Sequence, residues 1–521
     1  MKIMDFYALQ GFFKPGEVVR FTANIFVDND ETLPVQVEIF SGVVSSGVTT
    51  QVVKCNRGYN SKQIELPRGL NLPCGGYSAC LQIGDQQFWT AFDVQETWLA
   101  FPRYGFVSEF STDLLTDPQT IPQQMEQLAK YHITGLQFYD WQYRHDQLVA
   151  PHDDYLDPLQ RPLSLKTIRR LIEAAHQYNL AAMPYLAVYG ASIDFWHQHP
   201  DWGLYDEHGE PLLFEDFLGL MDPTHGTEWC DHLAEQCEQT LKSLPFDGLH
   251  IDQYGDPKEA YTQNGDEINI PQAFVDFINT QKEKLQVPVF FNAVGNWPIE
   301  TLAKSEADVM YIEVWPPTPK FTDLQQIVEN ARRLSGEQPV IIPIYIPATQ
   351  RTNVLLADAV IAASGGTHLE LGDNLHLLSD PYFPKSEALS DDYLVTLRRY
   401  WDFIVAYQDG IGPEAKNISL PMDLPKDVHG IARQNNHCLT FHLIQISPAD
   451  MWTEAQEKRP ELKNILIQIE LTDPVQQAFW ATPDREDWRL KAIPFEQQNG
   501  VLKLNLPALQ HWSMVKLQLK K

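Results

Sequence analysis

The first hundred residues contain short runs in which apolar and polar positions alternate. Three such runs lie at 17–23, 35–40 and 77–83, and turn-forming residues separate them. A period of two places alternate side chains on opposite faces of a strand, and turns at short intervals favour antiparallel pairing. The pattern predicts an N-terminal, immunoglobulin-like β-sandwich over residues 1–101.

From residue 102 the pattern changes to apolar strands that alternate with amphipathic helical stretches. We expect strands at 133–139, 181–187, 217–221, 248–251, 288–292, 309–312, 340–345 and 366–370. We expect helices at 119–131, 164–178, 226–243, 270–284, 322–335 and 352–363. Eight strands in about 300 residues suit a TIM barrel, so residues 102–412 are predicted to form a (β/α)8 barrel.

An open, doubly wound parallel sheet is the alternative for this middle region. Such a sheet usually carries a glycine-rich phosphate loop after its first strand. Here Asp140-Trp141-Gln142-Tyr143 follows the first predicted strand instead. The sequence therefore favours the barrel.

Short β-rich runs return in the last hundred residues, for example at 439–444 and 502–506. They predict a C-terminal β-sandwich over residues 413–521. The expected fold class is a multi-domain α/β protein in which two antiparallel β-sandwich domains flank a central barrel. Since barrel enzymes carry their active sites at the carboxyl ends of the strands, the middle domain is expected to hold the chemistry.

Composition and charge narrow the classes of ligand. The 521 residues include 39 Lys plus Arg and 69 Asp plus Glu, which gives a formal net charge of −30. Such a surface repels phosphate backbones and anionic headgroups, so we expect no nucleic acid or membrane partner, whereas a neutral sugar is not disfavoured. Six scattered cysteines and the absence of a secretory signal or long apolar run favour a cytoplasmic protein. The oligomeric state stays open.

Carboxylates and aromatic residues follow several predicted strands. Asp252 follows the strand at 248–251, and Glu313 follows the strand at 309–312. Glycosidases use one carboxyl group to attack the anomeric carbon and a second to protonate the leaving oxygen, and retaining enzymes hold the two about 5–5.5 Å apart. We predict that Asp252 and Glu313 form this catalytic pair.

Other kinds of site are less well supported by the sequence. His145 and its neighbours offer metal ligands, but no His-x-x-x-His or Cys-x-x-Cys spacing occurs, so we predict no metal ion and no cofactor. A serine hydrolase is disfavoured because no Gly-x-Ser-x-Gly follows a strand. A sugar-binding protein on an inactive barrel is disfavoured because both carboxylates are present.

Several motifs resemble those of glycoside hydrolase family 66, the family of endo-dextranases and cycloisomaltooligosaccharide glucanotransferases. They lie at 138–146, 246–256 and 311–316, with further similarity at 13–17, 101–105 and 365–373. The resemblance implies a β-sandwich, a (β/α)8 barrel and a second β-sandwich in this order. It also implies that Asp252 is the nucleophile and Glu313 the acid/base.

The resemblance suggests further substrate-binding residues around this pair. Hydrogen bonds to the sugar in subsite −1 are expected from Asp140, Tyr143 and His145, with Tyr189, Asn292, Glu370 and Asp373 as additional candidates. Trp315 is expected to stack on the sugar in subsite +1.

The function implied by the resemblance is retaining hydrolysis of α-1,6-glucosidic linkages in dextran or isomaltooligosaccharides. A transglycosylase on the same substrates and an α-glycosidase of different linkage specificity are the alternatives. Because neither a signal peptide nor an inserted carbohydrate-binding module is evident, we expect a cytoplasmic enzyme that trims imported isomaltooligosaccharides. Endo or exo action and chain-length preference stay open.

Overall fold

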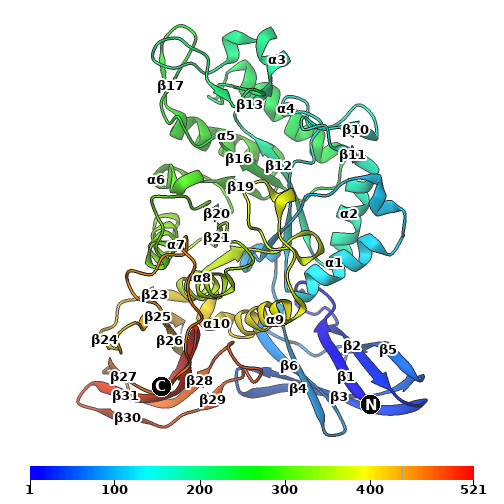
Figure 1. Ribbon diagram of the computed structural model, residues 1–521, viewed down its shortest axis with the longest axis vertical. Coiled ribbons are helices and arrows are strands. Elements are labelled where there is room, and N and C mark those ends of the chain that lie inside the picture. Colours follow the sequence, from blue (N-terminus) through cyan, green and yellow to red (C-terminus); the bar gives the residue numbers. More distant parts are fainter. Residues whose placement is uncertain (436–437, 521) are drawn as a thin grey trace.

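The computed structural model describes residues 1–435 and 438–520. Two β domains lie side by side beneath a central barrel, and the long helix α9 (Asp391–Ala406) lies between them and the barrel (Figure 1). This arrangement confirms the predicted fold class. None of the described helices is long and apolar enough to cross a membrane.

The N-terminal domain consists of two antiparallel sheets. One contains β1 (Lys2–Ala8), β2 (Arg20–Val27) and β5 (Gly58–Glu65). The other has the order β4 (Val44–Cys55), β3 (Glu31–Ser41), β6 (Gly75–Ile83) and β7 (Gln86–Val94). Alternate side chains such as Phe21, Val37 and Leu81 are buried between the sheets, as the period of two predicts.

Eight parallel strands form the barrel, and neighbours in the sheet follow the order of the chain. They are β8 (Tyr104–Val107), β9 (Gly135–Phe138), β12 (Ala181–Ala187), β16 (Leu249–Asp252), β19 (Val289–Asn292), β20 (Val309–Tyr311), β21 (Val340–Pro343) and β22 (Gly366–Leu369). The Phe106 amide donates to the Leu371 carbonyl at 3.3 Å, so the last strand meets the first and the sheet closes.

The helices that cover the barrel lie close to their predicted positions. The longer ones are α1 (Thr120–Lys130), α2 (Leu165–Gln177), α4 (Glu228–Ser243), α5 (Ile270–Leu285), α7 (Phe321–Ser335) and α8 (Arg351–Ser364). Short elements in the connections are α3 (Ile193–Gln198), α6 (Ile299–Leu302), α10 (Gln408–Ile411), β10 (Asp154–Leu156), β11 (Pro162–Ser164), β17 (Ala260–Tyr261) and β18 (Glu267–Ile268).

One predicted barrel strand is wrong and one was missed. The apolar run at 217–221 forms β15 (Leu218–Leu220), which pairs antiparallel with β13 (Gly190–Ser192) and β14 (Leu213–Phe214) outside the barrel. In the barrel β12 pairs directly with β16, so no place remains between them for this run, and its edges are taken by the antiparallel partners β13 and β14. The missing strand is β8, whose four buried residues follow the Pro102-Arg103 turn directly.

The C-terminal domain also consists of two antiparallel sheets. The first has the order β23 (Lys416–Ile418), β25 (His429–Asn435), β26 (Cys438–Ile444), β32 (Trp512–Leu519), β28 (Val475–Ala481) and β29 (Lys491–Ala492). The second has the order β24 (Met422–Asp423), β27 (Leu462–Glu470), β31 (Val501–Leu509) and β30 (Phe495–Gln498). Their facing side chains form a separate apolar core.

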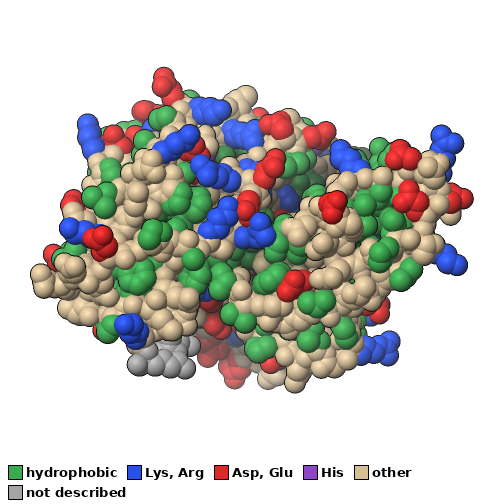
Figure 2. Space-filling view, turned by 90° about the horizontal axis from the view of Figure 1, so that it is seen from below, with side chains coloured by type: hydrophobic (Ala, Val, Ile, Leu, Met, Phe, Trp, Pro, Cys, Tyr) green, Lys and Arg blue, Asp and Glu red, His purple; other side chains and the backbone are tan. Residues whose placement is uncertain are grey.

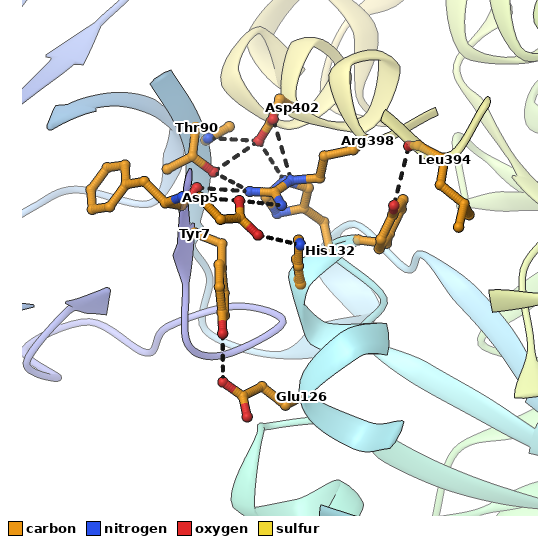
Figure 3. Close-up of polar contacts among 12 residues, drawn as sticks. Asp5, Tyr7, Thr90, Glu126, His132, Leu394, Arg398 and Asp402 are labelled. Carbon is orange, nitrogen blue, oxygen red and sulfur yellow. Dashed lines mark hydrogen bonds and ion pairs between the residues drawn. The ribbon is translucent and has the colours of Figure 1, made fainter. Parts of the chain in front are cut away.

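Buried polar contacts join the N-terminal domain to the barrel. Asp402 on α9 accepts hydrogen bonds from Thr90 Oγ1 at 3.0 Å and from the Ala91 amide at 2.8 Å, both on β7. Its Oδ1 also lies 2.9 Å from Nε2 of His132, which follows α1 (Figure 3). Arg398 donates to Thr90 at 2.8 Å. Because buried polar groups are costly when unpaired, this network fixes the domains relative to one another.

A buried ion pair at the same junction gives a stability prediction. Arg103 donates to both oxygens of Asp93, at 2.8 and 2.9 Å, and both side chains are fully buried. The variant Asp93→Asn leaves the guanidinium buried without its counter-charge, so we expect it to lose about 3–5 kcal/mol of unfolding free energy in urea titrations. The exposed pair Arg20–Glu65 is the control, and Glu65→Gln is expected to cost less than about 1 kcal/mol. Equal losses would contradict the prediction.

Candidate active site

A cavity of about 640 Å³ opens at the carboxyl ends of the barrel strands. Its lining comes from seven strands or the loops that follow them, and it is rich in aromatic rings and carboxylates. His250 and Tyr311 form part of its floor, with ring centroids 4.6 Å apart and nearly perpendicular planes. A largely apolar cavity with a few convergent polar groups is typical of a small-molecule site.

Asp252 is the last residue of β16, and its carboxylate points into this cavity. Oδ1 accepts hydrogen bonds from Asn292 Nδ2 and from the Gln253 amide, each at 2.9 Å. Oδ2 accepts one from the Tyr185 hydroxyl at 2.9 Å. Three donors hold the group in one orientation and stabilise its ionised form.

Glu313 follows β20 and is buried at the neighbouring side of the cavity. Its Oε2 accepts a hydrogen bond from Asn292 Nδ2 at 2.8 Å, and its Oε1 accepts one from the Tyr345 hydroxyl. The same Asn292 nitrogen thus contacts both carboxylates, so the oxygens it joins are less than about 6 Å apart. This agrees with the about 5–5.5 Å separation of retaining glycosidases and is shorter than the about 6.5–9.5 Å of inverting ones.

The electrostatics of the pair follow from burial and proximity. Burial raises the pKa of both Asp252 and Glu313, and repulsion from Glu313 raises the pKa of Asp252 further. Because two close carboxyl groups resist double ionisation, the pair retains a proton to higher pH than isolated carboxyl groups do. Hydrogen bonds from Asn292 and Tyr185 favour the charged form of Asp252. The pair is therefore able to combine one carboxylate with one carboxylic acid.

Five of the other predicted site residues line the same cavity: Asp140, His145, Tyr189, Asn292 and Trp315. Burial raises the pKa of Asp140 to about 6, although Arg161 lies 3.7 Å from its Oδ2. Burial lowers the pKa of His145 to about 4, so its imidazole is neutral near pH 7. The indole of Trp315 lies beside Tyr345, with ring centroids 5.5 Å apart. Their roles in sugar binding stay predictions.

The other three predicted residues do not line the cavity. The ring of Tyr143 packs against the Arg144 guanidinium, 4.1 Å from the ring centroid. Asp373 accepts hydrogen bonds from the Ser108 amide at 2.6 Å and from Gln124 at 2.7 Å. Glu370 is fully buried and accepts a hydrogen bond from Trp401 Nε1. Because none of the three side chains lines the cavity, the structure does not support their predicted contact with a sugar bound there.

Glu370 also belongs to a buried group of metal-ligand types. Among the described residues, ligand atoms of Asp358, His368 and Glu370 lie within 4.8 Å of one another. His368 Nδ1 lies 2.7 Å from Asp358 Oδ1, and burial lowers the pKa of His368 while raising that of Asp358. These shifts favour a protonated Asp358 carboxyl group and a neutral His368 imidazole, and a hydrogen bond between the two accounts for the short contact without a metal ion.

Sequence reasoning missed two tyrosines that contact the carboxylates. Tyr185 lies within β12 and donates to Asp252, and Tyr345 lies two residues beyond β21 and donates to Glu313. Tyr345 follows a barrel strand, so the same inspection of strand ends that selected Asp252 would have found it. Tyr185 gave no such signal because it lies inside an apolar run.

Comparison with known proteins shows which family has this arrangement. The model of glycosyl hydrolase family 66 matches residues 11–516. The chain belongs to this family.

Two characterised relatives in glycosyl hydrolase family 66 carry different names. The chain is 21% identical to a cycloisomaltooligosaccharide glucanotransferase of Niallia circulans, over 96% of this chain and 71% of that protein. It is 22% identical to a dextranase of Streptococcus salivarius, over 81% of this chain and 64% of that protein. The resemblance seen in the sequence motifs is confirmed.

The overall fold agrees with a solved structure of a family 66 protein. A cycloisomaltooligosaccharide glucanotransferase of a Paenibacillus species, complexed with cycloisomaltoheptaose, superposes with a TM-score of 0.91. The superposition covers 99% of each chain at 20% identity. The three-part architecture is therefore that of the family.

Proposed function

We propose that this protein is a retaining glycosidase that cleaves α-1,6-glucosidic linkages in dextran or isomaltooligosaccharides. The observation that carries the proposal is the contact of one Asn292 nitrogen with both Asp252 and Glu313 in the mouth of a family 66 barrel. The names of the relatives support α-1,6-glucans as the substrate class.

The proposed reaction is a double displacement. Asp252 Oδ attacks the anomeric carbon while Glu313 transfers its proton to the departing O6, which gives a β-glucosyl ester on Asp252. Glu313, now ionised, takes a proton from water, and the water oxygen attacks the same carbon and releases Asp252. Two inversions leave the product in the α configuration.

The surroundings of each carboxyl group suit its part in this reaction. Asp252 must be ionised in the first step, and three hydrogen bonds stabilise its carboxylate. Glu313 must be protonated, and its burial favours the neutral acid. Once Asp252 is esterified, its negative charge no longer repels that of Glu313, so the pKa of Glu313 falls. Glu313 is then ionised and can accept a proton from water.

A transglycosylase on the same substrates is the second candidate. It uses the same residues, because a sugar hydroxyl can replace water in the second step. The glucanotransferase of Niallia circulans aligns with almost the whole chain, which favours this candidate over other linkage specificities.

Product analysis tests the proposal and separates the two candidates. Incubation of the purified protein with dextran and with isomaltotetraose is expected to give shorter α-1,6-linked sugars, identified by mass and linkage. Larger or cyclic products would assign the protein to the transferases. No change in either substrate would contradict the proposed specificity.

The variant Tyr345→Phe tests the electrostatics of Glu313. The lost hydrogen bond stabilises the ionised carboxylate, so its removal is expected to raise the pKa of Glu313. Because the acid must be protonated, activity declines as pH rises through this pKa. The alkaline limb of kcat/KM should therefore move to higher pH by about one unit.

Tyr254→Phe is the matched control for this pH profile. Tyr254 lines the same cavity, and its buried hydroxyl has no hydrogen-bond partner among the described residues. We expect its profile to follow that of the parent. An alkaline limb that stays in place in Tyr345→Phe would show that Tyr345 does not tune the acid.

A further inference from the structure

One face of the N-terminal domain is covered only in part. In the sheet β4-β3-β6-β7, Val37 and Leu81 point into the domain core, so residues one position away point outwards. Near Ala91 this outer face packs against α9, where Asp402 accepts the Ala91 amide. Farther along the strands the face lies open and forms one wall of a groove of about 440 Å³.

The strand register arranges polar and aromatic side chains in rows on this wall. Gln36 pairs with Gln82, and Gln82 pairs with Gln87, so three amides form a row across β3, β6 and β7. In the described part of the chain, the Gln36 and Gln87 side chains make no hydrogen bond, and Gln82 makes one, to the Gly84 carbonyl. These amides have donors and acceptors free for a ligand.

Two aromatic rings lie next to the row of glutamines. Trp89 follows Gln87 on the same face of β7, and Phe40 lies on the same face of β3. Their ring centroids are 5.5 Å apart and their planes are tilted by 35°. Glu38 pairs with Cys80, which pairs with Trp89, and its carboxylate accepts a hydrogen bond from Ser45 at 2.7 Å.

The opposite wall comes from the C-terminal domain. Arg489 lies over the Trp89 ring, 4.1 Å from its centroid, and Lys491 also lines the groove. Asp487 pairs with both cations, at 2.6 Å from Arg489 Nε and 2.8 Å from Lys491 Nζ. Seen from below, the molecule is hollowed between its two lobes, and charged side chains of both signs gather there (Figure 2).

This combination of groups indicates the chemistry of the ligand. Asp487 and Glu38 balance the charges of Arg489 and Lys491, so the groove offers no net positive charge to an anion. Glutamine amides supply paired donors and acceptors that match neighbouring hydroxyl groups. The half-buried ring of Phe40, and the part of the Trp89 ring that Arg489 leaves uncovered, supply apolar surface. A neutral, polyhydroxylated chain with apolar faces satisfies both.

We propose that the groove is a second carbohydrate-binding site, which holds a segment of the same α-glucan away from the catalytic cavity. The two cavities share no lining residue. The identity of the glucan as α-1,6-linked rests on the proposed function. A second attachment point raises the local concentration of a long chain at the enzyme, whereas a trisaccharide is too short to benefit.

The double variant Gln36→Ala/Gln87→Ala tests the groove without disturbing the packing of Trp89 between the domains. Gln477→Ala, which removes an exposed strand glutamine of the C-terminal domain, is the matched control. Binding is measured by electrophoresis in native gels that contain dextran, with every variant in an Asp252→Asn background to prevent cleavage. Parallel gels contain soluble starch.

Dextran is expected to retard the parent and Gln477→Ala, and the double variant should need about tenfold more dextran for the same retardation. In the catalytically intact background, the KM for dextran should rise while isomaltotriose cleavage stays unchanged. Phe40→Ala should weaken retardation in the same direction. Equal retardation of the double variant and its control would overturn the groove site, as would retention by starch but not by dextran.

These results are distinguishable from a failure of the proposed function. A parent protein that cleaves dextran but whose groove variants bind normally would retain its proposed function and lose the second site. A parent that dextran retards through Gln36 and Gln87, but that does not cleave dextran, would retain the site and lose the proposed function.

Discussion

Replacement of Asp252 by asparagine is expected to lower kcat/KM on dextran by at least about 10³-fold while the protein stays folded. The amide has the shape of the carboxylate but cannot attack the anomeric carbon. With its carbonyl oxygen in the Oδ1 position, the amide can still accept from Asn292 and from the Gln253 amide, and its nitrogen can donate to the Tyr185 hydroxyl oxygen, so the cavity should keep its form. Initial rates of reducing-sugar release, with circular dichroism of the same samples, measure both quantities.

Asp256→Asn is the matched control, since this exposed aspartate lies in the loop that follows Asp252. It should retain activity close to that of the parent. Near-normal activity of Asp252→Asn would remove this residue from the nucleophile's role.

A smaller variant, Asp252→Gly, tests the direction of attack. Azide can enter the space of the missing carboxylate and attack an activated α-glucoside from that side. Because this is a single inversion, the expected product is a β-glucosyl azide. A merely structural role for Asp252 predicts no such product.

Alternation along the barrel strands explains why Glu370 lies outside the cavity although its motif follows a strand. Leu369 belongs to the cluster of side chains that fills the barrel. Neighbours in a strand point to opposite sides, so His368 and Glu370 point outwards, towards α8 and α9. The sequence predicts that Glu370 lies at the end of a barrel strand, but it does not show whether the side chain points into the barrel or outwards.

The same alternation accounts for the residues that do reach the cavity. Ile341 lies inside the barrel, and Tyr345 lies four positions later in the same phase, which brings its hydroxyl to Glu313. A sequence-based assignment of which side chains point inwards requires all eight strands and their register. The predicted strand at 217–221 was wrong, so this assignment was not possible. Six cavity side chains follow the inward phase of their strands: Tyr139, Tyr185, Asp252, Asn292, Glu313 and Tyr345.

Asp140 shows a second limit of prediction from sequence. It lies two residues beyond β9 and one position out of the inward phase, and its backbone has a φ of 52°. This left-handed conformation turns the chain so that the carboxylate lines the cavity. Aspartate tolerates such a φ better than most residues, but nothing in the local pattern indicated that it adopts one here.

The variant Glu313→Gln is expected to affect substrates according to their leaving groups. A natural glucan needs a proton on O6 as the bond breaks, so its cleavage should slow by about 10²–10⁴-fold. An isomaltoside with a nitrophenolate leaving group needs no proton, so its first step should slow by less than about tenfold. Pre-steady-state release of nitrophenol measures that first step directly.

The second step distinguishes an acid/base from a residue that only shapes the cavity. Without a base, water attacks the glucosyl ester slowly, so the variant should show a burst of nitrophenol followed by a slow phase. Azide needs no base, and it should restore turnover and give an α-glucosyl azide, because the ester on Asp252 has already inverted the centre once. Asp252→Gly gives the β anomer under the same conditions, so the two variants report on opposite faces of the sugar. Equal losses on both substrates, with no azide product, would assign Glu313 a structural role.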